Sequence, residues 1–117
     1  MWLFLPFGFY SVVQKRPADP FLTVRVRGVA DLDTLRERIP ALGPTILGGG
    51  TDYPARATIS HADFAAGMAA ISASIDYGNF KSKVGAVEGN RRHDVYMRVW
   101  SVLRGLEAEN VKPPGGK

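Results

Sequence analysis

The chain has 117 residues, of which 45% are hydrophobic, with a formal net charge of +4 and no cysteine. This length fits one domain, and six Phe, four Tyr and two Trp argue against a disordered chain. The absence of cysteine excludes disulfides, thiolate metal sites and thiol nucleophiles, and it favours a reducing, cytoplasmic location.

The first ten residues are almost entirely apolar, but they do not have the pattern of a signal peptide. No cationic residue precedes the apolar run, Pro6 and Gly8 interrupt it, and no small-x-small cleavage site follows. The run is also shorter than the roughly 20 residues that cross a bilayer. We expect two short strands instead, over residues 2–5 and 9–14, joined by a turn at 6–8.

Residues 21–27 alternate apolar and polar side chains and predict a third strand, in an antiparallel meander with the first two. A helix should then begin at Asp31 or Asp33, where an acidic residue suits the helix N-terminus, and end at Pro40. Residues 53–59 again alternate and predict a fourth strand.

The second half of the chain has a helical pattern. Ser60 is a candidate N-cap for a helix that reaches about residue 75. Residues 80–87 are ambiguous and form one helical turn or more, whereas residues 93–106 predict a helix. The predicted helix over 93–106 has an apolar stripe at Val95, Val99, Val102 and Leu106. Residues 111–117 predict a flexible tail after a single domain over 1–110.

These elements predict an α+β fold with the order β-β-β-α-β-α-(α). A mainly antiparallel sheet of four strands, covered by two to three helices on one face, makes a two-layer sandwich. A ferredoxin-like arrangement is one topology compatible with this order.

No motif points to catalysis, a metal or a cofactor, so we expect none of these and consider an enzyme improbable. His61 and His93 are distant in the sequence and have no histidine or cysteine partner at ligand spacing. The run Gly48-Gly49-Gly50-Thr51 lacks the lysine and the following helix of a phosphate loop, and a flexible connector explains it better.

The basic residues suggest two surfaces for an acidic partner. Arg25, Arg27 and Arg56 fall on the polar side of their strands, with Tyr10 or Tyr53 nearby, and such a sheet face can hold single-stranded RNA or DNA. The excess of basic residues lies in residues 78–117, which have eight basic and four acidic side chains.

A protein partner is the alternative for that last third, since aromatic and arginine side chains dominate protein interfaces. The candidate contact residues are Tyr77, Phe80, Lys81, Arg91, Arg92 and Arg98.

Six segments carry a resemblance to a family of small bacterial proteins of this length: 2–4, 8–11, 24–27, 52–56, 76–81 and 96–102, the last reading Tyr-Met-Arg-Val-Trp-Ser-Val. The resemblance implies a natural domain and no particular activity. Within it, Asp52, Arg56, Asp76, Asn79 and Lys81 suggest a polar network, structural or functional.

The leading functional hypothesis is a small non-enzymatic module that binds a protein, as an adaptor or as a steric inhibitor of the phage and plasmid type, such as an anti-CRISPR protein. A nucleic-acid-binding domain comes second. An enzyme using the carboxylates and cations of the polar network comes third. A homodimer is compatible with all three, and a membrane partner is not expected.

Overall fold

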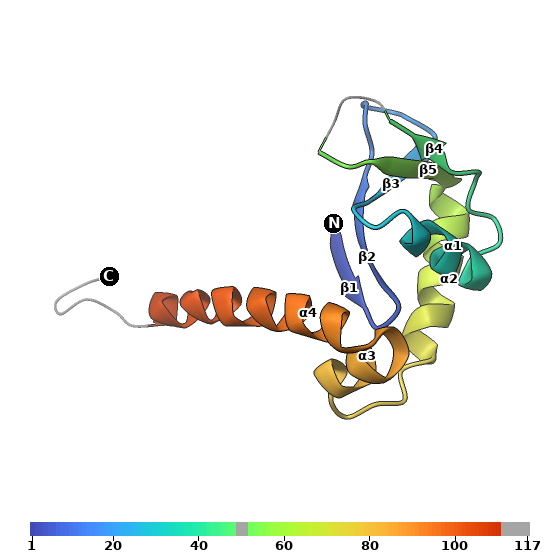
Figure 1. Ribbon diagram of the computed structural model, residues 1–117. Helices are drawn as coiled ribbons and strands as arrows, with labels where there is room; N and C mark the ends of the chain where they lie inside the picture. The colour runs from blue at the N-terminus through green and yellow to red at the C-terminus, as the bar shows by residue number, and fades with distance from the viewer. Residues whose placement is uncertain (49–51, 111–117) are drawn as a thin grey trace, which may run out of the picture. The chain divides into compact units, whose positions relative to one another are not determined.

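The computed structural model of the chain describes residues 1–48 and 52–110, so the expected tail at 111–117 lies outside the described residues. The chain divides into two compact units, Met1–Gly78 and Asn79–Lys117 (Figure 1). We call them the sheet unit and the helical unit. No helix among the described residues has the length and apolar character needed to cross a membrane.

The sheet unit contains a five-stranded sheet in the order β1-β2-β3-β5-β4, and every neighbouring pair is antiparallel. The expected meander of the first three strands is confirmed, but the expectation of four strands is wrong by one. The additional strand is only two residues long, and so short a segment has no alternation that could predict it. The strands are β1 Trp2–Leu5, β2 Gly8–Val13, β3 Phe21–Val26, β4 Ile46–Leu47 and β5 Ala55–Ser60.

Two helices, α1 (Ala30–Arg38) and α2 (His61–Ala73), lie on one side of this sheet (Figure 1). The inward-facing residues of β3 and β5 alternate with outward-facing polar ones, as the period-two pattern predicts. The α+β two-layer architecture is therefore confirmed. The strand order differs from a ferredoxin-like split β-α-β unit, because β3 pairs directly with β5. The core contains Tyr10, Val12, Val24, Val26, Leu32, Leu35, Ile39, Ala55, Ala57, Ile59, Phe64 and Ile71.

A buried hydrogen-bond network joins the β1–β2 hairpin to α1. The carboxylate of Asp31 accepts a hydrogen bond from the backbone N–H of Phe9 at 3.0 Å. The hydroxyl of Tyr10 donates to the carbonyl oxygen of Asp31 at 2.8 Å. The expected start of the helix at Asp31 or Asp33 is therefore corrected: α1 begins at Ala30 after Val29, which makes no side-chain cap, and the carboxylate of Asp31 bonds to strand β2.

Helix α2 begins as expected, because the hydroxyl of Ser60 accepts a hydrogen bond from the backbone N–H of Asp63 at 3.1 Å. Gly67 lies where α2 approaches the end of α1. A Cβ at this position would clash with the side chain of Ile39, so a larger residue would force that side chain to shift.

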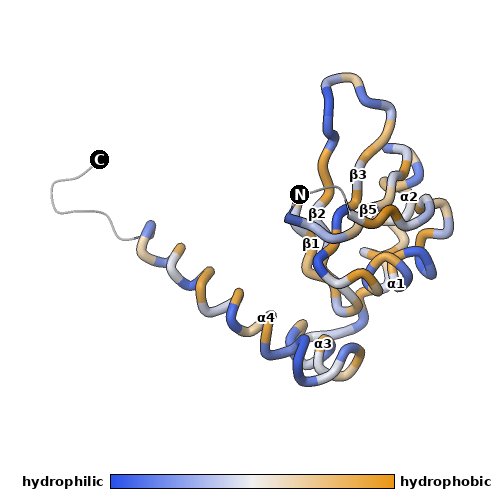
Figure 2. The backbone as a smooth tube through the Cα atoms, turned by 45° about the horizontal axis from the view of Figure 1, so that its top comes forward, coloured by the Kyte–Doolittle hydropathy of each residue, from blue (hydrophilic) through white to orange (hydrophobic). Residues whose placement is uncertain are grey.

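The helical unit consists of α3 (Phe80–Glu88) and α4 (Asn90–Leu103), which pack against each other, and a 3-10 helix, η1 (Arg104–Asn110). The ambiguous segment 80–87 is thus a helix, capped by the side chain of Asn79, which accepts from the N–H of Ser82 at 2.9 Å. The next helix begins at Asn90 rather than at residue 93, directly after Gly89 with φ +91°. Hydrophobic and hydrophilic residues alternate along α4 (Figure 2).

Candidate functional site

The outer face of the sheet, on the side away from α1 and α2, brings most of the predicted nucleic-acid-binding residues together. Strand pairing places one residue from each strand in a row across this face: Trp2 opposite Ser11, Ser11 opposite Arg25, Arg25 opposite Arg56, and Arg56 opposite Ile46. With strands about 4.8 Å apart, a row across four gaps spans roughly 19 Å.

Tyr53 positions two of the three arginines. The guanidinium carbons of Arg25 and Arg27 each lie 4.7 Å from the centre of the Tyr53 ring, within cation–π range. Arg27 also donates to the carbonyl oxygen of Asp52 at 2.9 Å, and Arg25 donates to the hydroxyl of Ser11 at 2.7 Å. The Tyr53 ring is therefore covered, and its role is to hold the arginines rather than to stack on a ligand.

Arg25 and Arg56 are direct cross-strand neighbours, so two positive charges lie side by side in the middle of the sheet. Like charges in this position destabilise a sheet unless something compensates them. Arg56 donates to the carbonyl oxygen of Gly48 at 2.8 Å. Among the described residues, Arg25 and Arg27 bond to a hydroxyl, a carbonyl and a ring, and not to a carboxylate. Within the described residues, the positive charges of Arg25 and Arg27 are thus not neutralised by a carboxylate.

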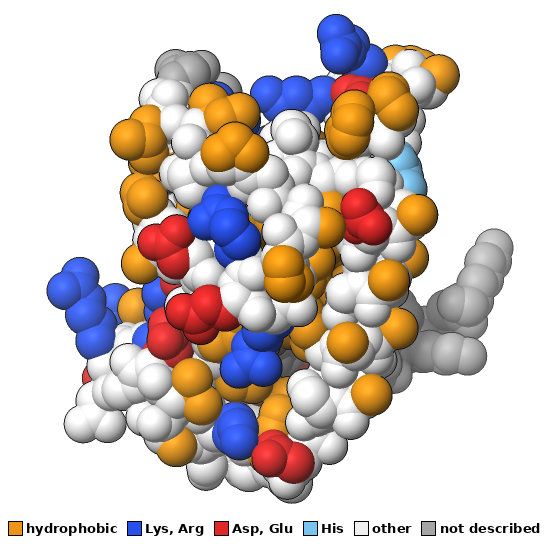
Figure 3. Space-filling view, turned by 90° about the vertical axis from the view of Figure 1, so that its right-hand side faces the viewer, with side chains coloured by type: hydrophobic (Ala, Val, Ile, Leu, Met, Phe, Trp, Pro, Cys, Tyr) orange, Lys and Arg blue, Asp and Glu red, His pale blue; other side chains and the backbone are white. Residues whose placement is uncertain are grey.

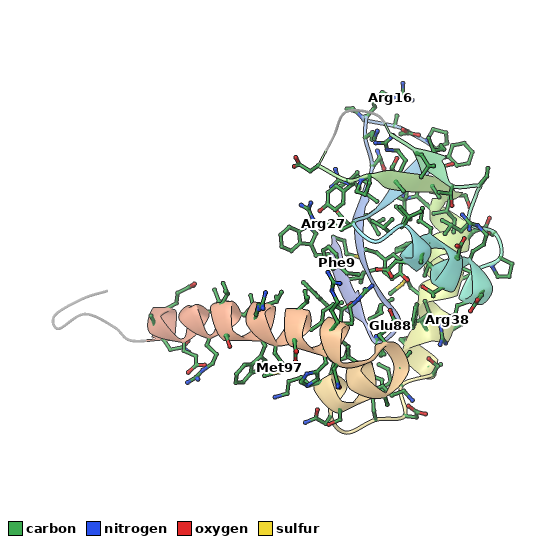
Figure 4. All side chains as sticks on the ribbon, viewed as in Figure 1. Phe9, Arg16, Arg27, Arg38, Glu88 and Met97 are labelled. Atoms are coloured by element: carbon green, nitrogen blue, oxygen red, sulfur yellow. The ribbon has the colours of Figure 1, made fainter. Side chains whose placement is uncertain are left out.

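Three aromatic side chains lie at the β1–β2 end of the same face. The ring of Phe9 is 4.6 Å from that of Phe4 and 5.9 Å from that of Trp2, centre to centre. Trp2 is 67% exposed, so one large aromatic surface is open to a ligand. Figure 4 shows Phe9 and Arg27 on the side of the sheet opposite to Arg38 of α1. We call Trp2, Phe4, Phe9, Arg25, Arg27 and Arg56 the arginine face.

Sequence reasoning missed these aromatics as candidates and included Tyr10 in their place. Tyr10 is fully buried on the inner face, where its hydroxyl bonds to Asp31, so it does not share the arginine face. Phe9 is one residue earlier and therefore points the other way. Alternation separates Phe9 from Tyr10, but only the register of β2 against β3 shows which of them shares a face with Arg25.

The predicted protein-contact residues are divided between the two units. Tyr77 belongs to the sheet unit, whereas the others belong to the helical unit. Inside the helical unit, Phe80 stacks on Tyr96 with ring centres 5.9 Å apart, and the ammonium of Lys81 lies 4.6 Å from the Trp100 ring centre. Arg92 approaches Glu88 at 3.6 Å. Arg91 and Arg98 are exposed on α4.

Three members of the suggested polar network make contacts with other residues. The carbonyl of Asp52 accepts from Arg27, Asn79 caps α3, and Lys81 lies over Trp100. Asp52, Arg56 and Asp76 belong to the sheet unit, and Asn79 and Lys81 to the helical unit.

The remaining chemical candidates are the histidines and the glycine run. His61 is exposed at the start of α2, and His93 lies 3.2 Å from Asp94. In the described part of the chain, no three His, Cys, Asp or Glu side chains form a group that could hold a metal ion. Of the glycine run, residues 49–51 lie outside the described residues.

The molecular face that contains α1 and α2 contrasts with the arginine face. Its surface carries Lys, Arg, Asp and Glu side chains intermixed with apolar ones (Figure 3). Arg36 and Asp33 on α1, for example, form an ion pair at 2.9 Å.

Comparisons of the chain with protein-family models, curated proteins and solved structures found no match.

Proposed function

We propose that the sheet unit binds single-stranded nucleic acid on the arginine face. The observation that carries this proposal is the row in which exposed Trp2 lies at one end and the adjacent Arg25 and Arg56 lie at the centre. An aromatic ring stacks on an unpaired base, and guanidinium groups bind the phosphates that follow it.

The chemistry of the arginine face favours single-stranded over double-stranded nucleic acid. It also favours binding that does not depend on the base sequence. An open sheet offers a flat surface on which unstacked bases can lie, whereas a duplex keeps its bases stacked. The sheet unit has equal numbers of basic and acidic residues, seven of each in residues 1–77. Attraction to phosphate therefore depends on where the arginines are placed and not on overall charge.

The test is a fluorescence anisotropy titration of the full chain against a labelled 12-nucleotide single strand and its matched duplex. We expect tighter binding to the single strand. If the three arginines each contact one phosphate, log affinity should fall with log salt concentration with a slope of about −2, at about −0.7 per contact.

Substitutions on the arginine face should weaken binding in a specific pattern. Arg27→Gln should flatten the salt slope, whereas Arg16→Gln, which removes the same charge from the exposed β2–β3 loop, should leave it unchanged. Trp2→Ala should weaken binding about tenfold, and Trp2→Phe should restore most of it. Equal effects of Arg27→Gln and Arg16→Gln would overturn the proposal, and circular dichroism would confirm that each variant is folded.

A second candidate function, a protein-binding module, is favoured by the helical unit. Trp100 and Val102 are 45% and 77% exposed on α4, and exposed apolar residues beside arginines are typical of protein interfaces. The adaptor and steric-inhibitor roles are two forms that this proposed protein-binding function can take. A tagged chain used as bait with and without nuclease separates the two functions: a stoichiometric protein that survives nuclease supports the second, and nucleic acid lost in moderate salt supports the first.

A further inference from the structure

One more exposed aromatic side chain lies on the outer face of the sheet, at the start of β3. Alternation along this strand directs Phe21 and Arg25 to the same face. Leu22 is next to Phe21 in the sequence and packs against the core on the other side. Phe21 is 50% exposed and Trp2 is 67% exposed. The outer face therefore presents a second large aromatic surface, separate from Trp2.

Hydrogen bonds fix the backbone of Phe21. Its N–H donates to the carboxylate of Asp19 at 3.0 Å, and Phe21 pairs with Ser60 of β5 in the sheet. The loop before it is closed by a hydrogen bond from the N–H of Asp19 to the carbonyl oxygen of Arg16 at 3.1 Å. A ring on an ordered strand gives up little conformational freedom when a base stacks on it, so Phe21 is a pre-organised stacking surface.

The two exposed aromatic residues are too far apart for one base to contact both. Trp2 lies two strand spacings from Arg25, about 10 Å, and Phe21 lies four residues from Arg25 along β3, about 13 Å. The path from Trp2 past Arg25 to Phe21 is thus about 23 Å long. A stacked strand advances about 3.4 Å per nucleotide, so this path holds at most about seven nucleotides. The outward residue of β3 between Arg25 and Phe21 is Thr23, whose side chain is shorter than both.

The charges along this path favour an anionic strand. All residues of the five strands are described, and they include two arginines and no Asp or Glu. The acidic residue next to the start of β3 is Asp19, whose side chain is 11% exposed, accepts from the N–H of Phe21 and lies 3.7 Å from Arg16. Asp52 precedes β5, at the end of that strand opposite to the residue that pairs with Phe21. The sheet itself therefore has no carboxylate that would repel a phosphate along the path.

We infer that Phe21 is a second base-stacking residue of the proposed nucleic-acid site. The substrate is then an oligonucleotide or a longer strand that reaches from Trp2 past the arginines to Phe21, and not a mononucleotide. This inference rests on the first proposed function and names its substrate class. Once one base is stacked on Trp2, contact of a later base with Phe21 is intramolecular, so the two contacts reinforce each other.

The dependence of affinity on strand length tests the inference. Fluorescence anisotropy of the full chain is measured with labelled oligothymidylates of four and eight nucleotides, since only the octamer is long enough to reach both aromatic residues. Phe21→Ala should weaken binding of the octamer about tenfold. It should change binding of the tetramer about twofold at most, because a tetramer still binds at Trp2. An equal loss for both lengths, or no loss for the octamer, would overturn the inference.

Further variants separate base stacking from folding. Phe21→Tyr keeps the ring and should bind the octamer as the natural chain does, whereas Phe21→Leu keeps only an apolar side chain and should lose affinity as Phe21→Ala does. Ile75→Ala is the matched control, because Ile75 is an apolar residue of the sheet unit that is 59% exposed but lies beyond α2 and outside the strands. Circular dichroism checks that each variant is folded. Equal affinities of Phe21→Leu and Phe21→Tyr, or equal effects of Phe21→Ala and Ile75→Ala, would overturn the inference.

Photocrosslinking locates the bases on the sheet. Octamers with 5-iodouracil at the first or at the last position are irradiated with the chain, and mass spectrometry identifies the crosslinked residues. We expect crosslinks at both Trp2 and Phe21, because the two ends of an octamer reach both residues. Crosslinks at Trp2 from both octamers, with none at Phe21, would overturn the inference.

The failure of this inference differs from the failure of the nucleic-acid-binding function. If Arg27→Gln weakens binding of the octamer and Phe21→Ala does not, the role of Phe21 is overturned and the arginine face is still a nucleic-acid-binding surface. If the natural chain binds neither the tetramer nor the octamer, both are overturned.

Discussion

The sheet unit buries its apolar side chains between strands and helices that are distant in the sequence, whereas the helical unit is built from two neighbouring helices. Tyr10, Val24 and Leu32 are completely buried in the first unit. In the described part of the second, only Val84 and Tyr96 are buried. We therefore expect amide hydrogens of the central strands to exchange more slowly than those of α4.

The largest effect should follow from Tyr10→Ala, which empties the centre of the sheet unit. Removal of a fully buried aromatic ring costs about 4 kcal/mol of unfolding free energy, measured by urea denaturation. Tyr10→Phe keeps the ring but removes the hydroxyl that bonds to the carbonyl oxygen of Asp31 and to the hydroxyl of Thr34, and it should cost about 1 kcal/mol. If α3 and α4 keep their exchange protection when Tyr10→Ala opens the sheet, the two units unfold separately; if protection is lost together, the comparison fails and the chain is one cooperative unit.

Asp31→Ala should have the next largest effect, about 2 kcal/mol, because the partly buried N–H of Phe9 would lose its acceptor. Asp33→Ala is the matched control, since Asp33 is an acidic residue in the same helical turn whose carboxylate is exposed and pairs with Arg36. Such an exposed ion pair contributes at most about 1 kcal/mol. Urea denaturation of both variants measures the difference, and equal losses would mean that helix-dipole interaction and not the bond to β2 is what Asp31 supplies.

Each unit contains a helix whose N-terminus is capped by a side chain, so removal of a cap can be compared between the two units. Ser60→Ala removes the cap of α2 and Asn79→Ala that of α3, and each should cost about 1 kcal/mol of local stability. Hydrogen exchange resolves where the loss occurs. We expect Ser60→Ala to speed amide exchange in the first turn of α2, and Asn79→Ala to speed it in α3. If either substitution speeds exchange in both units, the two units are not stabilised separately.

The smallest expected effect concerns the stack of Phe80 on Tyr96, which joins α3 to α4. A double-mutant cycle with Phe80→Ala and Tyr96→Ala should give a coupling of about 0.5 kcal/mol, at the lower end for aromatic pairs, because Phe80 is half-exposed. Thermal unfolding of the four chains provides the cycle. A coupling indistinguishable from zero would show that burial of Tyr96, and not ring stacking, stabilises the packing of α3 against α4.

The candidate site was only partly predictable from the sequence. Arg25, Arg27 and Arg56 were expected to share a face because each is on the polar side of an alternating strand, and the register confirms it for Arg25 and Arg56. The aromatic residues of the site were not predicted, since Trp2 and Phe4 lie in an apolar run whose two faces cannot be distinguished by hydropathy.

What the sequence by itself determined was local. Residue patterns along the chain predicted four of the five strands, Ser60 predicted its cap, and the absence of cysteine excluded thiol chemistry. These features depend on residues at most a few positions apart. The tertiary structure decided the use of Asp31, the fifth strand and the composition of the arginine face. Each of these depends on which distant strand or helix lies opposite, and a one-residue change of register would move every side chain to the other face.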